Sequence, residues 1–387
     1  MRFVSASFVF DGSRFLDHRP VLVLDNANCF VEYTDRNTIS SDKVEYYEGI
    51  ICPGFINAHC HLELSHMKGL IPEKTGLLNF AKNIITKRNS FSKEQIGEAI
   101  IEADGKMWES GIVAVGDISN TPDTFEAKQK SKIAYHTFLE LIGFDPERAN
   151  KIFSVGKELQ QEADRMGLKS SLVPHAPYSV SGELMKRIAL DAAETNCPIT
   201  IHNQENADED LFFQKKKDAF AELYEFLKMP IDFFKPSGQS SLQTYLADLE
   251  KCGNLILVHN TFSSEEDLKW AKKQHKDLYW CLCPNANLYI ENTLPDLKSF
   301  VKHNCNMVIG TDSLASNHTL SVTDELNVLL TYFKWLKLED VLKWATSNGA
   351  EALGLQGHFG NFVKGRNAGL NWLSYKDNAL KLEKKLA

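Results

Sequence analysis

The chain has 387 residues, of which 43% are hydrophobic and 24% are charged, a composition typical of a folded globular protein. Its formal net charge of −8 argues against a nucleic-acid-binding protein, which normally presents a basic face. No apolar run approaches the roughly 20 residues that span a bilayer, so we expect no membrane partner.

The N-terminus and the cysteines indicate where the protein resides. The first residues lack the apolar core and the small-residue cleavage site of a signal peptide. Eight scattered cysteines in a chain of this length are typical of reduced thiols, not of a disulfide framework. We therefore expect a cytoplasmic protein.

Short strand-like runs broken by turns occupy residues 1–52. Residues 7–10 precede an Asp-Gly pair and residues 21–24 precede an Asp-Asn pair, and both pairs favour turns. A segment of this kind predicts a small β-structured unit that precedes the main domain.

Residues 53–346 alternate between apolar strand-like runs and amphipathic helical stretches. The eight strand candidates are 54–61, 112–117, 133–139, 171–175, 199–202, 255–259, 278–283 and 307–312. Helical patterns include residues 94–108, 182–195 and 265–274. Eight strands separated by helices favour an α/β fold, a TIM-like (β/α)8 barrel.

The longest insertion between strand candidates covers residues 206–253 and is rich in aromatic side chains. One interpretation is a pair of helices that pack on the barrel wall. The other is a lid over the ends of the strands, where barrel enzymes carry their active sites.

Residues 347–387 contain several glycines and a final strand-like run at 369–373. We expect this tail to pair with residues 1–52. The predicted domains are therefore a barrel over residues 53–346 and a side domain whose two halves are residues 1–52 and 347–387.

Polar residues with metal-ligand chemistry stand at the ends of several strand candidates. His59 and His61 are two residues apart on one strand, so both side chains project to the same face. His202, His259 and Asp312 each follow an apolar run, and strand ends converge at one mouth of a closed barrel. Independent placement of these residues is the alternative. Together they suit zinc, iron, manganese or nickel better than calcium or magnesium.

Six segments carry a resemblance to the metal-dependent amidohydrolase superfamily. They read PGFINAHCH at 53–61, HNQE at 202–205, VHN at 258–260, CPNAN at 283–287, GTDS at 310–313 and TSNGAEALG at 346–354. The resemblance implies a (β/α)8 barrel with a β-sandwich built from both termini. It also implies that His59, His61, His202 and Asp312 are metal ligands.

The resemblance points to the one-metal branch of deaminases and chlorohydrolases. Two-metal members typically use a carboxylated lysine from the fourth strand, and His175 stands there in this chain. A glutamate three residues after the fifth-strand histidine, Glu205, also matches that branch. We expect one divalent metal ion, zinc in the first place and iron as the alternative.

Chemistry, strand spacing and the resemblance together suggest roles for five residues. Glu205 would carry a proton to the ring nitrogen and help ammonia leave, while His259 and Asp312 would orient the attacking water. His175 would contact the substrate, and Glu63 could do so if its strand continues. The alternatives are an exposed loop carboxylate for Glu205, a structural role for His175 and a salt bridge for Glu63.

These observations predict a hydrolase that deaminates an adenine-type or related amino-heterocycle by attack of a metal-bound hydroxide on the ring carbon. Residues 61–65 resemble aminodeoxyfutalosine deaminases more than S-adenosylhomocysteine or guanine deaminases. The alternatives are hydrolysis of another C–N bond or of a C–Cl bond, and a barrel without catalytic activity. The expected partner is a small-molecule substrate, and a homo-oligomer is compatible with the sequence.

Overall fold

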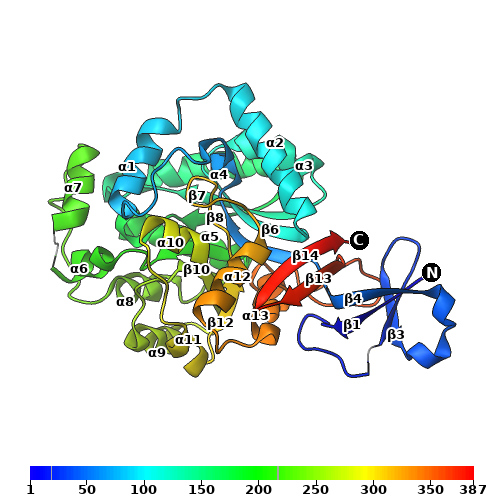
Figure 1. Cartoon of the computed structure of the whole chain (residues 1–387). Helices are drawn as coiled ribbons and strands as arrows, with labels where there is room; N and C mark the ends of the chain where they lie inside the picture. Colours follow the sequence, from blue (N-terminus) through cyan, green and yellow to red (C-terminus); the bar gives the residue numbers. More distant parts are fainter. Residues whose placement is uncertain (19, 216–217) are drawn as a thin grey trace.

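A computed structural model of the chain describes residues 1–18, 20–215 and 218–387. Figure 1 shows a barrel of strands wrapped by helices, with a sheet built from both chain ends beside it. The two termini lie on the same side of the molecule, next to this sheet. Among the described residues, no helix combines the length and the apolar character needed to cross a membrane.

Eight parallel strands form the barrel. They are β5 (Phe55–Cys60), β6 (Ile112–Ser119), β7 (Ala134–Leu141), β8 (Lys169–Pro174), β9 (Ile199–Asn203), β10 (Leu255–His259), β11 (Leu278–Leu282) and β12 (Asn306–Ile309). Strands β5 to β8 pair in sequence, as do β9 to β12.

Two contacts close the barrel. A parallel bridge between Cys60 and Asp312 joins β5 to the end of β12. The amide of His202 donates to the carbonyl of His175 at 2.9 Å and joins β9 to the end of β8. The predicted (β/α)8 fold is confirmed, because each of the eight strand candidates overlaps one observed strand.

Helices surround these strands, and α1 lies at the barrel mouth. Their bounds are α1 (Leu77–Lys87), α2 (Lys93–Glu109), α3 (Phe125–Lys130), α4 (Ala149–Arg165), α5 (Gly182–Thr195), α9 (Glu265–Gln274), α10 (Pro284–Ile290), α11 (Leu297–Lys302), α12 (Val322–Tyr332), α13 (Leu338–Trp344) and α14 (Ser347–Ala352). Short 3-10 helices are η1 (Arg36–Thr38), η2 (Ser41–Lys43), η3 (Leu62–Met67), η4 (Pro122–Thr124), η5 (Pro146–Arg148), η6 (Pro177–Ser179) and η7 (Leu246–Leu249). Local chemistry explains several helix starts: Ser92 and Ser264 each form a capping box that satisfies free backbone amides.

The two chain ends share one six-stranded sheet, in the order β14-β13-β4-β1-β2-β3. Its strands are β1 (Arg2–Val9), β2 (Val21–Leu24), β3 (Phe30–Thr34), β4 (Val44–Cys52), β13 (Asn371–Lys376) and β14 (Ala379–Lys385). The tail strand β13 pairs antiparallel with β4, so the predicted association of the termini is confirmed. One buried apolar cluster supports the sheet: Val4, Ala6, Val9, Leu22, Leu24, Phe30, Ile51 and Leu370.

Helix α14 begins at the predicted start of the C-terminal half of the side domain, residue 347, yet it packs against the barrel strands β5 and β12. A side chain at Gly349 would place its first carbon 2.8 Å from Cβ of Ile56, so only glycine permits this close approach. The chain therefore passes to the terminal sheet after this helix, and the division at residue 347 stays a prediction.

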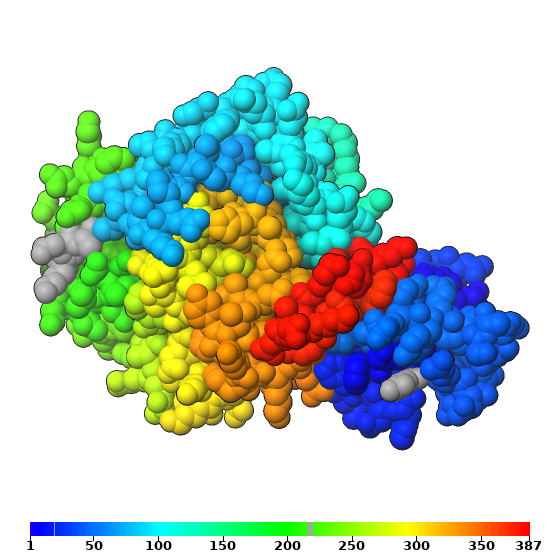
Figure 2. Space-filling model, in the orientation of Figure 1, coloured from blue at the N-terminus to red at the C-terminus, as the bar shows by residue number. Residues whose placement is uncertain are grey.

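The insertion at 206–253 folds into α6 (Ala207–Lys215), α7 (Asp218–Phe226), α8 (Ser241–Tyr245) and η7, while residues 216 and 217 lie outside the described part. Figure 2 shows its described residues at the end of the molecule opposite the terminal sheet. Phe212, Phe220 and Tyr224 are buried there in an apolar cluster with Leu77 of α1. The insertion thus packs on the barrel, and its helix α7 also faces the barrel mouth.

Candidate metal centre

Strand β5 brings two histidine rings to the barrel mouth. All residues of β5 are buried, and the strand ends at Cys60. His59 and His61 nevertheless project to the same side, and their Nε2 atoms lie 3.2 Å apart. Backbone hydrogen bonds from Thr311 and Asp312 to the carbonyl of His59, at 2.9 and 3.1 Å, hold this strand end against the end of β12.

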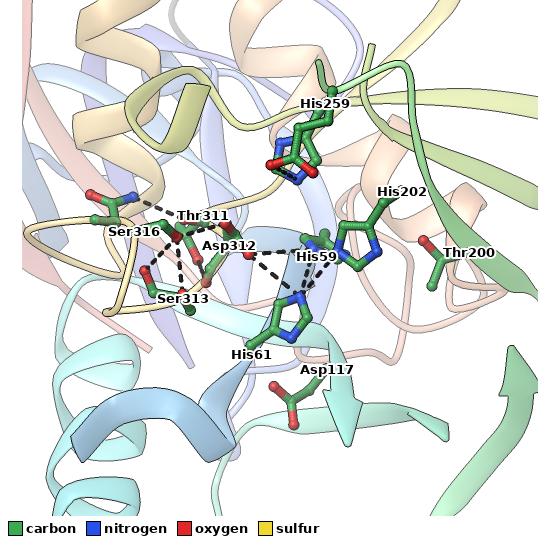
Figure 3. Close-up of polar contacts among 12 residues, drawn as sticks. His59, His61, Asp117, Thr200, His202, His259, Thr311, Asp312, Ser313 and Ser316 are labelled. Atoms are coloured by element: carbon green, nitrogen blue, oxygen red, sulfur yellow. Dashed lines mark hydrogen bonds and ion pairs between the residues drawn. The ribbon is translucent and has the colours of Figure 1, made fainter. Parts of the chain in front are cut away.

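A third ring comes from β9 on the other half of the barrel. The Nε2 atom of His202 lies 3.2 Å from Nε2 of His61. Figure 3 shows the rings of His202, His61 and His59 gathered around one point. Nitrogen ligands about 2.0–2.1 Å from a tetrahedral zinc ion lie about 3.3–3.4 Å apart. The spacing of these nitrogen atoms therefore fits a shared ion.

Asp312 completes the set from the turn after β12. Its Oδ1 atom lies 3.4 Å from Nε2 of His61 and 3.7 Å from Nε2 of His59. Its Oδ2 atom accepts a hydrogen bond from Ser316 at 2.6 Å, which leaves Oδ1 directed at the rings. Burial opposes ionisation, but contact with the histidine rings holds the pKa of Asp312 well below its ordinary value.

The histidines are held in the neutral form that a metal ion requires. Burial lowers the pKa of His61 to about 3 and lowers the pKa of His59 and His202 as well. The Nδ1 atom of His202 donates to the carbonyl of His175 at 2.7 Å, so its Nε2 carries the free lone pair. The four predicted ligand side chains thus converge, and their role as ligands stays a prediction.

His259 and Glu205 face the same space. The Nδ1 atom of His259 donates to Oδ1 of Asn287 at 2.8 Å, which leaves Nε2 as an acceptor. That Nε2 atom lies 3.6 Å from Oε1 of Glu205. Glu205 is only 6% exposed, which contradicts the alternative of a solvated loop carboxylate. Burial raises its pKa to about 7.

A buried amide network fixes the turns that carry Glu205 and His259. The amide of Asn203 donates to Oδ1 of Asn260 at 3.0 Å, and Ser263 donates to Oε1 of Gln204 at 2.6 Å. Gln204, His259 and Asn260 all have positive φ, at 44°, 70° and 55°, a conformation that is rare for such side chains. The hydrogen bonds hold this unfavourable backbone in place. We did not predict this network from sequence, although Asn203 and Asn260 belong to the matching segments.

A cavity of about 220 Å³ opens above these groups. Its polar floor consists of His61, His175, His202, Glu205, His259 and Asp312. Its apolar wall comes from α1 and α7 and from the end of β7: Leu77, Phe80, Ile84, Leu223, Leu227 and Ile142. The cavity therefore suits a ligand that has one polar reacting face and an apolar remainder.

His175 lines this cavity, as the sequence predicts. Its Nδ1 atom lies 2.6 Å from the hydroxyl oxygen of Ser179, which orients the ring. Burial lowers the pKa of His175 to about 4, so the ring is neutral near pH 7. A neutral ring can donate or accept one hydrogen bond, and its contact with substrate stays a prediction.

The strand expected to carry Glu63 into the mouth does not continue that far. Strand β5 ends at Cys60, and Glu63 belongs to the 3-10 helix η3. The amide of Leu62 donates to Asp117 at 2.7 Å, so the chain turns away from the sheet after His61. Glu63 instead forms an ion pair with Arg88 at 3.1 Å, the salt bridge that was the alternative for this residue. Direct contact of Glu63 with substrate is therefore a prediction that the geometry does not support.

A fully buried ion pair lies next to the turn that follows His61. Oδ2 of Asp117 lies 2.6 Å from Nζ of Lys128, and neither side chain is exposed to solvent. The other oxygen of Asp117 accepts from the amide of Leu62, next to His61. Figure 3 shows Asp117 beside His61 and outside the cluster of rings. This carboxylate thus positions the turn after His61.

Glu140 is a cavity residue that we did not predict. It stands on β7, one residue beyond the predicted strand 133–139, and is 6% exposed. Asn120 donates to its Oε2 atom at 3.0 Å, whereas its Oε1 atom is buried with no hydrogen-bond partner among the described residues. Burial raises the pKa of Glu140 to about 7. The signal that could have revealed it is a glutamate that directly follows a strand candidate.

Comparison with known proteins agrees with this geometry. A family model described as the amidohydrolase family matches residues 50–384, which span the barrel and the tail strands. An adenosine deaminase of Helicobacter pylori is 30% identical over 323 residues, which cover 81% of this chain and 76% of that protein. A 5-methylthioadenosine/S-adenosylhomocysteine deaminase of Pyrococcus abyssi is 25% identical over 342 residues, which cover 83% of this chain and 73% of that protein.

A solved structure shows the same similarity in three dimensions. The crystal structure of Helicobacter pylori aminofutalosine deaminase in complex with methylthio-coformycin aligns with a TM-score of 0.82 and 26% sequence identity. The alignment covers 97% of this chain and 93% of that chain. The barrel and the terminal sheet are therefore arranged similarly in the two proteins.

Proposed function

The chain belongs to the amidohydrolase family, and from this premise we propose that it is a metal-dependent hydrolytic deaminase of adenine-type nucleosides. One observation carries the proposal: Glu205 and His259 lie 3.6 Å apart and line the same cavity as His61, His202 and Asp312. This set matches what replacement of a ring amino group needs, namely an activated water and a proton carrier next to it.

We propose that His59, His61, His202 and Asp312 hold one divalent metal ion, with zinc as the first candidate and iron as the second. The Nε2 spacings of 3.2 Å and the neutral state of the rings support this assignment. When bound, such an ion lowers the pKa of a coordinated water to about 7 and so supplies the nucleophile.

The protein's own groups would manage the protons. Nε2 of His259 and Oδ1 of Asp312 are acceptors directed at the centre, and we assign them the orientation of the attacking water. Glu205, whose burial raises its pKa to about 7, would hold a proton at the ring nitrogen next to the reacting carbon. The same carboxyl group would then protonate the amino group as ammonia leaves.

The shape of the cavity supports a substituted nucleoside as substrate. Three apolar side chains at the cavity rim are unusually exposed: Ile85 at 43%, Ile142 at 52% and Leu227 at 41%. Exposed apolar groups around a cavity favour an apolar group on the ligand, here a substituent on the sugar. The relatives named above act on adenosine, on 5-methylthioadenosine and S-adenosylhomocysteine, and on aminofutalosine, by their names. We propose a substrate in this range.

The test is release of ammonia by zinc-loaded and iron-loaded protein. The substrates are adenosine, 5-methylthioadenosine, S-adenosylhomocysteine and aminofutalosine, with guanine and a chlorinated triazine as controls for other reactions on this fold. We expect ammonia from at least one adenine nucleoside and none from the controls. A protein that retains stoichiometric metal and releases ammonia from none of the nucleosides would contradict the proposal. Chloride release from the triazine would indicate hydrolysis of a C–Cl bond, the alternative reaction.

Two further properties stay predictions. We propose a cytoplasmic location, because eight scattered free cysteines in a chain of this length are typical of reduced thiols. Assembly into a homo-oligomer is compatible with the sequence, and sedimentation analysis of the purified protein would test it.

A further inference from the structure

One carboxylate oxygen in the cavity has no assigned role. The Oε1 atom of Glu140 is buried and has no hydrogen-bond partner among the described residues. The side chain of Glu140 is 2% exposed, yet the residue lines the same cavity as Glu205 and His259. A buried acceptor without a donor is unfavourable, so we expect such an atom to gain a partner when the site is filled.

The described residues do not supply that partner. The nearest ring nitrogen, Nδ1 of His202, lies 3.6 Å from Oε1 of Glu140 and already donates to the carbonyl of His175 at 2.7 Å. The nearby guanidinium of Arg88 is paired with Glu63 at 3.1 Å. Asn120 donates only to the other oxygen, Oε2, at 3.0 Å. A donor for Oε1 must therefore come from water or from the ligand.

The wall behind Glu140 is rigid, which is typical of a binding site. Oε2 of Glu63 accepts from the backbone amides of Asn120 and Thr121 at 2.9 and 3.3 Å. The side-chain amide of Asn120 in turn reaches both the carboxylate and the backbone carbonyl of Glu140, at 3.0 and 3.2 Å. Glu63 and Asn120 are thus positioning residues for the carboxylate.

The location of Glu140 indicates which part of a nucleoside it would meet. One ligand-capable atom each from Glu140, His175 and His202 lies within 4.8 Å of the others. Glu140 therefore stands next to His175, the residue expected to contact the heterocycle, and on the opposite side of His202 from the proposed metal ion. In a nucleoside the sugar is attached to the heterocycle away from the reacting carbon, so a ring that contacts His175 would bring its sugar toward this part of the wall.

From these contacts we propose that Oε1 of Glu140 accepts a hydrogen bond from a sugar hydroxyl of the substrate and so selects ribonucleosides over deoxyribonucleosides. The proposal rests on the proposed nucleoside deaminase function. A hydroxyl is the donor that a ribose offers, and it would satisfy the buried oxygen that has no donor among the described residues. A site built for a hydroxyl discriminates strongly against an analogue that lacks it.

The experiment pairs substrates with variants. The kcat/KM for ammonia release is measured on adenosine, 2′-deoxyadenosine and 3′-deoxyadenosine, with the parent protein and Glu140→Leu. Leucine has a similar volume and needs no hydrogen bond, so the variant should fold. Thermal melting and metal content verify this, and Glu140→Gln is the second variant. Glu147→Leu, an exposed glutamate in the next connection, is the matched control.

We expect the parent to lose about 10-fold to 100-fold in kcat/KM on one of the two deoxynucleosides. Glu140→Leu should lose a similar factor on adenosine and less than about 3-fold on that deoxynucleoside, because the contact is already absent there. Glu147→Leu should match the parent on all three substrates.

Equal losses for Glu140→Leu on adenosine and both deoxynucleosides would overturn the inference, since Glu140 would then act only on structure. An unchanged kcat/KM on adenosine would overturn it too. Neither result affects the proposed deaminase function. If the parent releases no ammonia, calorimetry with inosine and the two deoxyinosines decides the point: equal affinities, or no binding, overturn the inference separately.

Discussion

The barrel mouth buries mainly polar side chains, whereas the terminal sheet buries mainly apolar ones. The mouth buries four histidines, several carboxylates and a network of amides. The terminal sheet buries an apolar cluster, and its ion pair between Arg2 and Glu45 is 30% and 40% exposed. An exposed ion pair of this kind contributes about 0–1 kcal/mol, so burial of apolar side chains holds the sheet.

The difference indicates which substitutions should affect chemistry and which should affect stability. Groups at the mouth are held by neighbours in geometries that cost free energy, as expected for a functional site. Side chains in the terminal sheet lie far from the histidine nitrogens of the metal centre and contribute to stability through packing. The comparison therefore predicts loss of activity without unfolding at the mouth, and loss of stability without a change of chemistry in the sheet.

The largest effect is expected for His202→Ala. Removing this imidazole leaves too few ligands for tight binding of the ion, and the water is then no longer activated. We expect metal content near zero and a loss of more than about 1,000-fold in kcat/KM. Metal analysis and ammonia release measure the two effects. His358→Ala, at an exposed histidine, is the control, and a full metal complement in His202→Ala would refute the ligand assignment.

Glu205→Gln should separate proton transfer from metal binding. The variant should keep its metal and lose about 100-fold to 10,000-fold in kcat, because glutamine cannot carry the proton. The parent needs a protonated Glu205, whose pKa burial raises to about 7, so its kcat/KM should fall as the pH rises above that value.

A pH–rate profile measures this decline, and it should be missing from the residual activity of Glu205→Gln. Glu222→Gln, at an exposed position of α7, should keep the parent profile. An unchanged profile in Glu205→Gln would assign the titration to another group.

In the terminal sheet, Leu22→Ala should reduce stability and spare chemistry. Leu22 is fully buried in the apolar cluster of the sheet, and such truncations cost about 2–5 kcal/mol. Urea unfolding measures the loss, while kcat of the folded, metal-loaded fraction should equal that of the parent. Glu32→Ala, at an exposed position on β3, is the control. A lower kcat in Leu22→Ala would show that the sheet supports the mouth.

The smallest effect is expected at Glu209, a fully buried acid near the mouth. Gln204 and Ser241 donate to its Oε1 atom, while Oε2 has no partner among the described residues. Burial raises the pKa of Glu209 to about 8, with a further contribution from the charges of Asp210 and Glu205. A raised folded-state pKa stabilises the protein below the unfolded value, and this stability is lost as the pH rises toward about 8.

Glu209→Gln mimics the protonated acid and should remove that loss. We expect the variant to match the parent near pH 5 and to exceed its free energy of unfolding by on the order of 1–3 kcal/mol near pH 8. Urea unfolding at the two pH values tests this, with Glu225→Gln, at an exposed position on α7, as control. A constant difference between variant and parent would show that Glu209 does not titrate in this range.

Local patterns were sufficient to predict much of the fold and the site. The period-two spacing places His59 and His61 on one face, and the observed strand β5 has both there. Apolar runs marked all eight barrel strands, because a strand buried on both faces is apolar along its length. The strand limits were less accurate: the candidate at 307–312 continues past the observed end of β12 at Ile309.

Long-range contacts explain what the local patterns missed. Strand β5 ends before Glu63 because Asp117, on the neighbouring strand, accepts a hydrogen bond from the amide of Leu62. Glu140 matters because Asn120 occupies one of its oxygens and nothing described occupies the other. The neighbouring residues do not predict either hydrogen-bonding pattern, because each pattern depends on which remote side chain lies nearby in the folded protein.

The order of ligand types along the chain and the apolar runs before them are properties of neighbouring residues, so the amino-acid sequence alone was enough to recognise them. The 3.2 Å between His61 and His202, which stand 141 positions apart, required the closed barrel. The closed barrel also buries Glu205, which raises the pKa of this residue. It likewise buries Oε1 of Glu140, which has no hydrogen-bond partner among the described residues. Distance, burial and hydrogen-bond partners depend on the packing of remote segments, and only the tertiary structure decides them.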